Sequence, residues 1–125
     1  MDAIEIFYPN IEKYFLKERY NKVFHEDIRN FKYPYYDYII FGDVIEHMTV
    51  EEAQAVLEYA NPRCRDLIIA IPFLYRQDEI DGNKNEIHIQ SDLTKEIFAE
   101  RYPGYQCLWA DNSYAYYHKD STKNA

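Results

Sequence analysis

The chain has 125 residues, of which 47% are hydrophobic and 29% are charged, a composition typical of one folded globular domain. Its formal net charge of −8 disfavours a broad nucleic-acid surface, because phosphate recognition needs clustered lysine and arginine. The amino terminus is acidic, unlike a secretory signal, and no apolar run is long enough to span a bilayer. The two cysteines lack the short spacing of a zinc or disulfide framework, which favours a reducing, cytoplasmic setting.

The first third of the chain predicts two short strands and a helix. Alternating and apolar residues over 2–7 predict a strand. Pro9 suits a first helical turn, and apolar residues at helical spacing predict a helix over 9–20. A second short strand is expected at 23–24, and a loop broken by proline over 31–36.

Residues 36–73 predict a strand, an acidic loop, a helix and a second strand. The apolar run 38–41 suits a strand that is buried on both faces. Thr49 and Glu52 have the spacing of a capping box, which starts a helix that ends at Asn61-Pro62. Four small or apolar residues share one face of this helix: Ala53, Val56, Leu57 and Ala60. A second buried strand over 66–71 completes a parallel strand–helix–strand unit.

The last third predicts a loop, a helix and a strand pair. Residues 74–86 are polar and irregular, with a turn at Gly82-Asn83. Ser91 or Asp92 is expected to cap a helix that ends near residue 102. Two strands follow, at 105–109 and 114–118, and residues 119–125 are expected to form a frayed tail.

Acidic and histidine side chains gather after two of these strands. In parallel sheets, ligands bind beyond the carboxyl ends of the strands, which puts Asp43, Glu46 and His47 at the edge of a site. Neighbours three or four residues apart lie on one side of a helical turn, so these groups can converge with His88 from the neighbouring strand. Acid–base, substrate-facing, metal-binding and purely structural roles all fit these residues, and His88 can equally bond a backbone carbonyl.

The run Asp-Val-Ile-Glu-His-Met at 43–48, between the strands "YDYII" and "LIIAIPF", resembles the middle of a class I S-adenosylmethionine-dependent methyltransferase. The resemblance implies an α/β, Rossmann-like sheet that is mostly parallel and ends in an antiparallel carboxyl-terminal strand pair. By the same resemblance, Glu5 holds the ribose hydroxyls of the cofactor, and Asp27 with Ile28 lies near its adenine. A carboxylate at a strand end is also commonly a helix cap or a solvated residue.

One part of the family pattern is missing. The glycine-rich cofactor loop belongs between the first strand and first helix, yet the three glycines, Gly42, Gly82 and Gly104, all come too late. The resemblance therefore implies one domain over 1–118 without that strand and helix. In the family the first strand lies between the second and the fourth, so these two must pair directly or leave free edges. Two outcomes are expected: either the sheet is rearranged within a monomer, or a homo-oligomer or an amino-terminal partner covers it.

The resemblance implies methyl transfer to a small-molecule or glycan acceptor that faces Asp43, Glu46, His47 and His88. A second hypothesis, favoured by the missing loop, is a non-catalytic methyltransferase-like module that oligomerises or binds a partner. A third follows because the acidic-x-x-Glu-His motif with a later histidine resembles the metal site of RNA 3′-end 2′-O-methyltransferases. Asp43 stands where that family has glutamate, and the acidic composition does not suit RNA, so a divalent metal is left open and not favoured.

Overall fold

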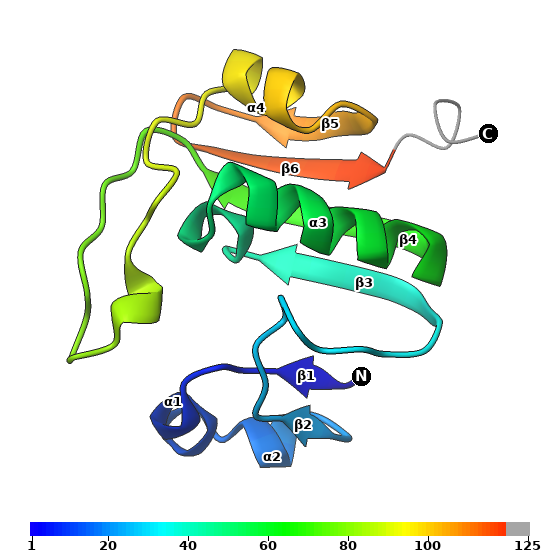
Figure 1. The fold of residues 1–125 in the computed structure, drawn as a ribbon, viewed down its shortest axis with the longest axis vertical. Coiled ribbons are helices and arrows are strands. Elements are labelled where there is room, and N and C mark those ends of the chain that lie inside the picture. The colour runs from blue at the N-terminus through cyan, green and yellow to red at the C-terminus, as the bar shows by residue number, and fades with distance from the viewer. Residues whose placement is uncertain (120–125) are drawn as a thin grey trace.

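The computed structural model describes residues 1–119, which form two β-sheets and the helices around them (Figure 1). The smaller sheet pairs β1 (Ala3–Ile4) with β2 (Val23–Phe24) in parallel. The larger sheet has the order β3-β4-β6-β5 and consists of β3 (Tyr36–Gly42), β4 (Cys64–Pro72), β6 (Tyr114–Lys119) and β5 (Tyr105–Ala110). The pair β3–β4 is parallel, whereas β4–β6 and β5–β6 are antiparallel, which confirms the predicted fold class. No helix in this described part is long and apolar enough to cross a membrane.

The predicted strand–helix–strand unit is confirmed at the centre of the larger sheet. It consists of β3, α3 (Val50–Ala60) and β4, joined by the short 3-10 turns η1 (Ile45–His47) and η2 (Asn61–Arg63). The capping box forms, because the Glu52 amide donates to Thr49 Oγ1 at 3.2 Å and the Thr49 amide donates to Glu52 Oε1 at 3.0 Å. The predicted apolar face of α3 is buried against the sheet.

The amino-terminal elements are shorter than the sequence predicts. The single helix expected over 9–20 is wrong, because the chain forms α1 (Tyr8–Lys13) and α2 (Leu16–Arg19). Phe15 lies between them with φ of 54°, a left-handed conformation that interrupts the helical hydrogen bonding. The strand expected over 2–7 contracts to the two residues of β1.

The carboxyl-terminal helix starts later than predicted. The cap of α4 (Lys95–Arg101) is Thr94, whose Oγ1 accepts from the Ile97 amide at 3.2 Å. Asp92 instead pairs with Arg101 at 2.5 Å, so the predicted cap at Ser91 or Asp92 is wrong. Both predicted carboxyl-terminal strands form. Residue 119 belongs to β6, and the rest of the predicted tail lies outside the described residues.

Helices cover only one face of the larger sheet. In Figure 1, α3 and α4 lie in front of it, and the buried core lies between them and the sheet. Strand pairing puts four large side chains on the opposite face, where their exposed fractions are 54% for Tyr38, 52% for Ile40, 52% for Trp109 and 44% for Tyr116. The prediction that β3 is buried on both faces is therefore wrong, because no described helix covers this open face.

The two sheets do not join. Among residues 1–119, β1 pairs only with β2 and β3 pairs only with β4, so the strand edges that face each other carry no ladder. Figure 1 shows the arrows of β1 and β3 pointing in the same direction. Of the two arrangements expected from the sequence, the described chain adopts the one with free edges.

Candidate functional site

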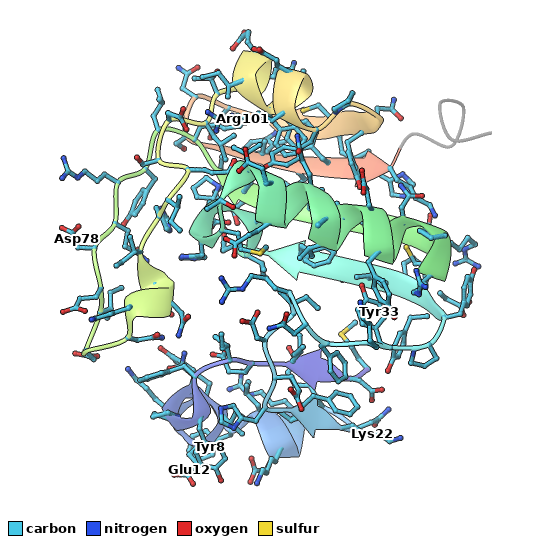
Figure 2. All side chains as sticks on the ribbon, viewed as in Figure 1. Tyr8, Glu12, Lys22, Tyr33, Asp78 and Arg101 are labelled. Carbon is cyan, nitrogen blue, oxygen red and sulfur yellow. The ribbon has the colours of Figure 1, made fainter. Side chains whose placement is uncertain are left out.

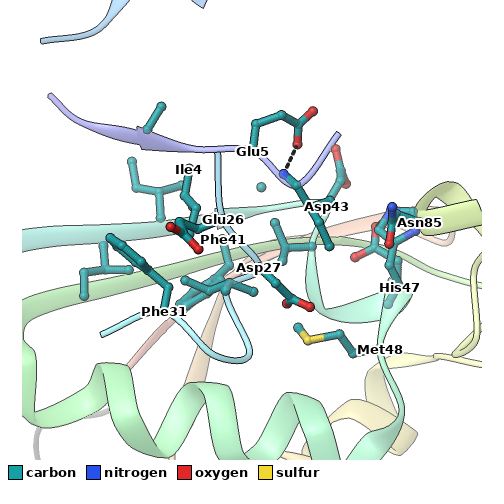
Figure 3. A pocket seen from close by; sticks show the side chains of 18 of the residues that line it. Ile4, Glu5, Glu26, Asp27, Phe31, Phe41, Asp43, His47, Met48 and Asn85 are labelled. Carbon is teal, nitrogen blue, oxygen red and sulfur yellow. Dashed lines mark hydrogen bonds and ion pairs between the residues drawn. The ribbon is translucent and has the colours of Figure 1, made fainter. Parts of the chain in front are cut away.

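A cavity of about 1350 Å³ lies between β1 and β3 and extends past the carboxyl end of β3 (Figure 3). Its walls come from β1, from the segment after β2, from β3 with η1, and from the loop that leads to His88. All seven predicted site residues line it, namely Glu5, Asp27, Ile28, Asp43, Glu46, His47 and His88. The topology thus brings together groups that are up to 83 residues apart in the sequence, from Glu5 to His88.

Glu5 follows β1 directly, and its carboxylate is anchored in place. Its Oε1 accepts from Asn10 Nδ2 at 2.7 Å, and its Oε2 accepts from the Ile6 amide at 3.1 Å. An ionised carboxylate offers about four lone-pair sites, so two acceptor positions are left for a ligand. Glu5 is therefore a fixed acceptor at the cavity wall.

Asp27 lines the same cavity but has a strong partner of its own. Hydrogen bonds from the Arg29 guanidinium, at 2.6 to 3.0 Å, hold the pKa of this carboxyl below its usual value. Arg29 also bonds Glu52 at 2.9 Å and so ties this segment to α3. The Asp27 carboxylate is thus largely committed to an ion pair, whereas Ile28 offers an apolar surface packed against the core.

Glu46 is a buried carboxyl group without a partner. The turn η1 places it between β3 and α3, with an exposed fraction of 1%. Neither carboxylate oxygen has a hydrogen-bond partner among the described residues. Burial raises the pKa of Glu46 to about 8, so the protonated form dominates at pH 7.

Two histidines point their free nitrogens at Glu46. His47 Nδ1 bonds the Ile87 carbonyl at 3.1 Å, and His88 Nδ1 bonds the Tyr75 carbonyl at 2.8 Å. A carbonyl only accepts, so each Nδ1 carries the proton and each neutral ring keeps a free lone pair on Nε2. These Nε2 atoms lie 3.8 Å (His47) and 4.0 Å (His88) from Glu46 Oε2, and the two rings meet edge to face at 4.6 Å. Burial lowers the pKa of His47, which favours its neutral form.

Asp43 lines the cavity but stays outside this Glu46–His47–His88 cluster. Its carboxylate accepts a short hydrogen bond from the Tyr114 hydroxyl at the start of β6. Burial, with the bond to Asp43 as the next cause, raises the pKa of Tyr114. Sequence reasoning missed Tyr114, because its partner is 71 residues away and the local sequence gives no signal of the contact.

A second residue missed by sequence reasoning, Gln90, holds the η1 turn in place. Its side-chain amide donates to the Ile45 carbonyl at 2.9 Å and the Met48 carbonyl at 3.1 Å. Its Oε1 accepts from the Tyr102 hydroxyl at 2.7 Å, and its backbone amide donates to the Glu46 carbonyl at 3.0 Å. One buried amide therefore fixes the turn that presents Glu46 and His47.

We expect Gln90→Leu to lower the free energy of unfolding by about 2 to 4 kcal/mol, because the Met48 carbonyl and the Tyr102 hydroxyl lose their bonds to Gln90, and the Ile45 carbonyl keeps only its bond from the Met48 amide. Urea titration followed by circular dichroism measures this loss. Gln54→Leu is the matched control, since Gln54 makes one exposed bond, to the Arg101 carbonyl. Equal, small losses in the two variants would contradict the anchoring role of Gln90.

We expect Glu46→Gln to stabilise the chain at pH 8 and to have little effect near pH 4.5. The folded state holds the Glu46 proton up to a pKa of about 8, against 4.5 in the unfolded chain. Wild-type stability therefore falls, relative to the variant, by about 1.4 kcal/mol per pH unit at most between these values. Thermal unfolding with a chelator present measures the difference, and a gap between the two proteins that does not change with pH would contradict it.

Solved structures similar to this chain agree on its fold, whereas sequence comparisons find no relative. No protein-family model and no curated protein sequence matches the chain. The magnesium protoporphyrin IX methyltransferase of Synechocystis PCC 6803, solved with bound SAM, is 13% identical, with a TM-score of 0.59 over 94% of this chain and 57% of that one. The mitomycin 7-O-methyltransferase is 9% identical, with a TM-score of 0.58 over 90% of this chain and 37% of that one. An O-methyltransferase family protein from Burkholderia thailandensis is 14% identical, with a TM-score of 0.55 over 94% and 42%.

These matches cover most of the present chain, which spans 57% or less of the three solved proteins. Identities of 9 to 14% establish a common fold, while substrates need separate arguments. Residues 1–119 have part of the Rossmann-like fold of a class I S-adenosylmethionine-dependent methyltransferase.

Proposed function

We propose that this chain binds S-adenosylmethionine and takes part in methyl transfer to an oxygen or nitrogen atom of a small-molecule or glycan acceptor. The observation that carries the proposal is the single cavity shared by the residues expected to face the cofactor and those expected to face the acceptor. The similar solved proteins include enzymes named as methyltransferases of magnesium protoporphyrin IX and of mitomycin. Both are small-molecule acceptors.

The cavity wall fits the adenosine part of the cofactor. The anchored Glu5 carboxylate has acceptor positions left for two adjacent ribose hydroxyls. Ile28 supplies an apolar surface for an adenine ring, while Asp27 would share its carboxylate between Arg29 and the exocyclic amine. No glycine precedes residue 42, so the first 41 residues have no glycine that would let the backbone approach the methionine part closely. When bound, the cofactor supplies an electrophilic methyl group.

The Glu46–His47–His88 cluster provides proton transfer on the acceptor side. The free Nε2 of His47 or His88 can take the proton of an acceptor hydroxyl, because both Nδ1 atoms already carry protons. Protonated Glu46 can donate a hydrogen bond to the acceptor oxygen and orient it. Asp43, held by Tyr114, adds a fixed carboxylate at the rim of the same cavity.

Methyl transfer is tested directly with S-adenosylmethionine labelled in its methyl group and a panel of phenols, sugars and amines. The expected result is label in at least one acceptor class, lost in His88→Ala and kept in His25→Ala, a matched change at an exposed histidine. An unchanged rate of methyl transfer in His88→Ala would show that His88 is not needed for the reaction. No transfer, with S-adenosylhomocysteine still bound, would favour the non-catalytic module that the missing glycine loop also supports.

A second candidate function is a metal-assisted reaction at the Glu46–His47–His88 cluster. The ligand atoms of the three side chains all lie within 4.8 Å of one another. Within residues 1–119 the Glu46 carboxylate has no hydrogen-bond partner, and the bonds from Nδ1 to backbone carbonyls fix both histidine rings with Nε2 near Glu46, as second-shell bonds do in metal sites. One carboxylate and two imidazoles suit Mn²⁺ or a similar divalent ion that would polarise an acceptor hydroxyl. The net charge of −8 favours a small acceptor over RNA.

A further inference from the structure

The part of the cavity beyond the carboxyl end of β3 is rich in hydrogen-bond acceptors. His47 and His88 each keep a lone pair on Nε2, because their Nδ1 protons are bonded to the Ile87 and Tyr75 carbonyls. The two Nε2 atoms lie 3.8 and 4.0 Å from Glu46 Oε2. Glu46 lines the cavity with an exposed fraction of 1%, and neither of its carboxylate oxygens has a partner among the described residues. A buried polar group of this kind indicates a binding site for a ligand that donates hydrogen bonds.

Two further carboxylates line the cavity around this cluster. Asp43 accepts a bond from the Tyr114 hydroxyl, although a carboxylate offers about four lone-pair sites in total. Glu86 accepts side-chain bonds only at the long distance of 3.4 Å, from Gln77 and Asn83. After burial, the charges of Asp43 and Glu86 also raise the pKa of Glu46, because like charges lie near it. Three carboxyl groups and two imidazole lone pairs therefore meet at this end of the cavity.

The cavity as a whole is acidic. Eight of the side chains that line it are carboxyl groups, whereas Arg29 is the only lysine or arginine among the described lining residues. Arg29 is already bonded to Asp27 and Glu52. Carboxylates on a concave surface focus a negative potential, which attracts cations and repels anions. An acceptor that carries a free carboxylate or phosphate group therefore fits this cavity poorly.

The kind of polar atom that lines the cluster indicates which cation fits. A primary ammonium group has three hydrogen-bond donors and no acceptor, so it can bond Glu46 and both histidine Nε2 atoms at once. A hydroxyl group has one donor and would use one of these three acceptors. A quaternary ammonium group has no donor and is bound by cages of aromatic rings, whereas this cluster presents oxygen and nitrogen atoms.

We propose that the methyl acceptor is a primary amine, whose ammonium group binds between Glu46 Oε2 and the Nε2 atoms of His47 and His88. Asp43 and Glu86 stabilise its positive charge from the surrounding wall. The inference rests on the proposed function, because it names the acceptor class of that site. The ammonium nitrogen gives one proton to a histidine Nε2 and then forms a bond to the methyl carbon, while the electron pair of the carbon–sulfur bond stays on sulfur. The methylated amine carries the positive charge that the sulfonium loses.

The test compares three probes of similar shape that differ in the charge of one group: benzylamine, benzyl alcohol and benzoate. Each is titrated into the purified chain with a chelator present, and binding is followed by nuclear magnetic resonance. We expect benzylamine to bind at least about tenfold more tightly than benzyl alcohol, since hydrogen bonds to charged groups are the stronger ones, and benzoate to bind weakest. The ring nitrogen shifts of His47 and His88 report hydrogen bonds at Nε2 and so locate the bound amine.

Two variants of the chain show whether the amine binds at the proposed place. Glu46→Gln and Asp43→Asn each remove a carboxylate while keeping the size of the side chain, and asparagine can still accept from Tyr114. We expect each to weaken benzylamine binding by about tenfold and to leave benzyl alcohol binding nearly unchanged. Asp78→Asn is the matched control, because Asp78 is exposed, lies outside the cavity and points away from the rest of the chain (Figure 2).

Two outcomes would overturn the inference. One is equal binding of benzylamine and benzyl alcohol by the wild-type chain. The other is benzylamine binding that falls as much in Asp78→Asn as in the two cavity variants, which would reflect the general attraction of a cation to a chain of net charge −8.

Failure of this inference and failure of the proposed function give different results. Methyl transfer to phenols or sugars by a chain that does not bind benzylamine would contradict the amine acceptor and support the proposed function. Benzylamine binding that depends on Glu46, in a chain that does not bind S-adenosylhomocysteine, would support the ammonium site and count against methyl transfer.

Discussion

Glu5→Ala is expected to weaken the binding of S-adenosylhomocysteine by about 10- to 100-fold. The Glu5 carboxylate is the anchored acceptor at the cavity wall, and hydrogen bonds to a charged group contribute about 1.5 to 3 kcal/mol. Isothermal titration calorimetry of the purified wild-type chain and the variant measures the change. The product is the better probe, because it binds without reacting.

Glu12→Ala is the matched control for this prediction. Glu12 is an exposed glutamate in α1 that does not line the cavity, so its loss removes the same charge from the same region. Equal affinity of the wild type and Glu5→Ala for S-adenosylhomocysteine would show that Glu5 does not contact the cofactor. Thermal unfolding must accompany the titration, because Glu5 also accepts from Asn10 and so links β1 to α1.

Glu46→Gln and His88→Ala are each expected to lower the affinity for Mn²⁺ by more than about 100-fold, if the cluster holds a metal. Each change removes one of three converging ligands. Removing even an outer hydrogen bond to a metal ligand already lowers metal affinity by about 10- to 100-fold. Electron paramagnetic resonance of free Mn²⁺ reports the bound fraction without any knowledge of the acceptor.

Asp78→Asn is the matched control for the metal prediction. Asp78 is an exposed carboxylate in the segment between β4 and η3 (Lys84–Glu86), outside the cavity. Absence of saturable Mn²⁺ binding in the wild-type chain would contradict a metal site and favour a role of the Glu46–His47–His88 cluster in proton transfer. Binding that survives both substitutions would place the ion elsewhere.

Local chemistry in the sequence was enough to predict the centre of the fold. The Thr49–Glu52 capping box, the helical spacing of the α3 core residues and the two flanking apolar runs all depend on neighbours within a few positions. The same local patterns predicted β5 and β6. They failed at Phe15, where a single left-handed residue splits a helix whose apolar spacing is uninterrupted.

Residues that follow neighbouring parallel strands were expected to meet at one edge of the sheet, and Asp43, Glu46, His47 and His88 do line one cavity. Glu5, Asp27 and Ile28, expected there from the family resemblance, line the same cavity. The sequence could not predict the burial, orientation or ion-pair partners of these side chains. Only the tertiary structure buries Glu46 without a partner, turns both histidine Nε2 atoms toward it, and commits Asp27 to Arg29. Each of these depends on contacts between segments far apart in the chain, such as Gln90 beneath the η1 turn.

The separation of the two sheets was likewise predicted only in part from the sequence. The absence of early glycines was visible in the sequence, and it predicted either direct pairing of the flanking strands or free edges. Periodicity cannot choose between these, because an apolar strand looks the same whether its edge is paired or free. Only the tertiary structure decided it, since strand pairing depends on contacts between distant segments: β1 pairs only with β2 among residues 1–119, and Ile40 is exposed on a sheet face that no described helix covers.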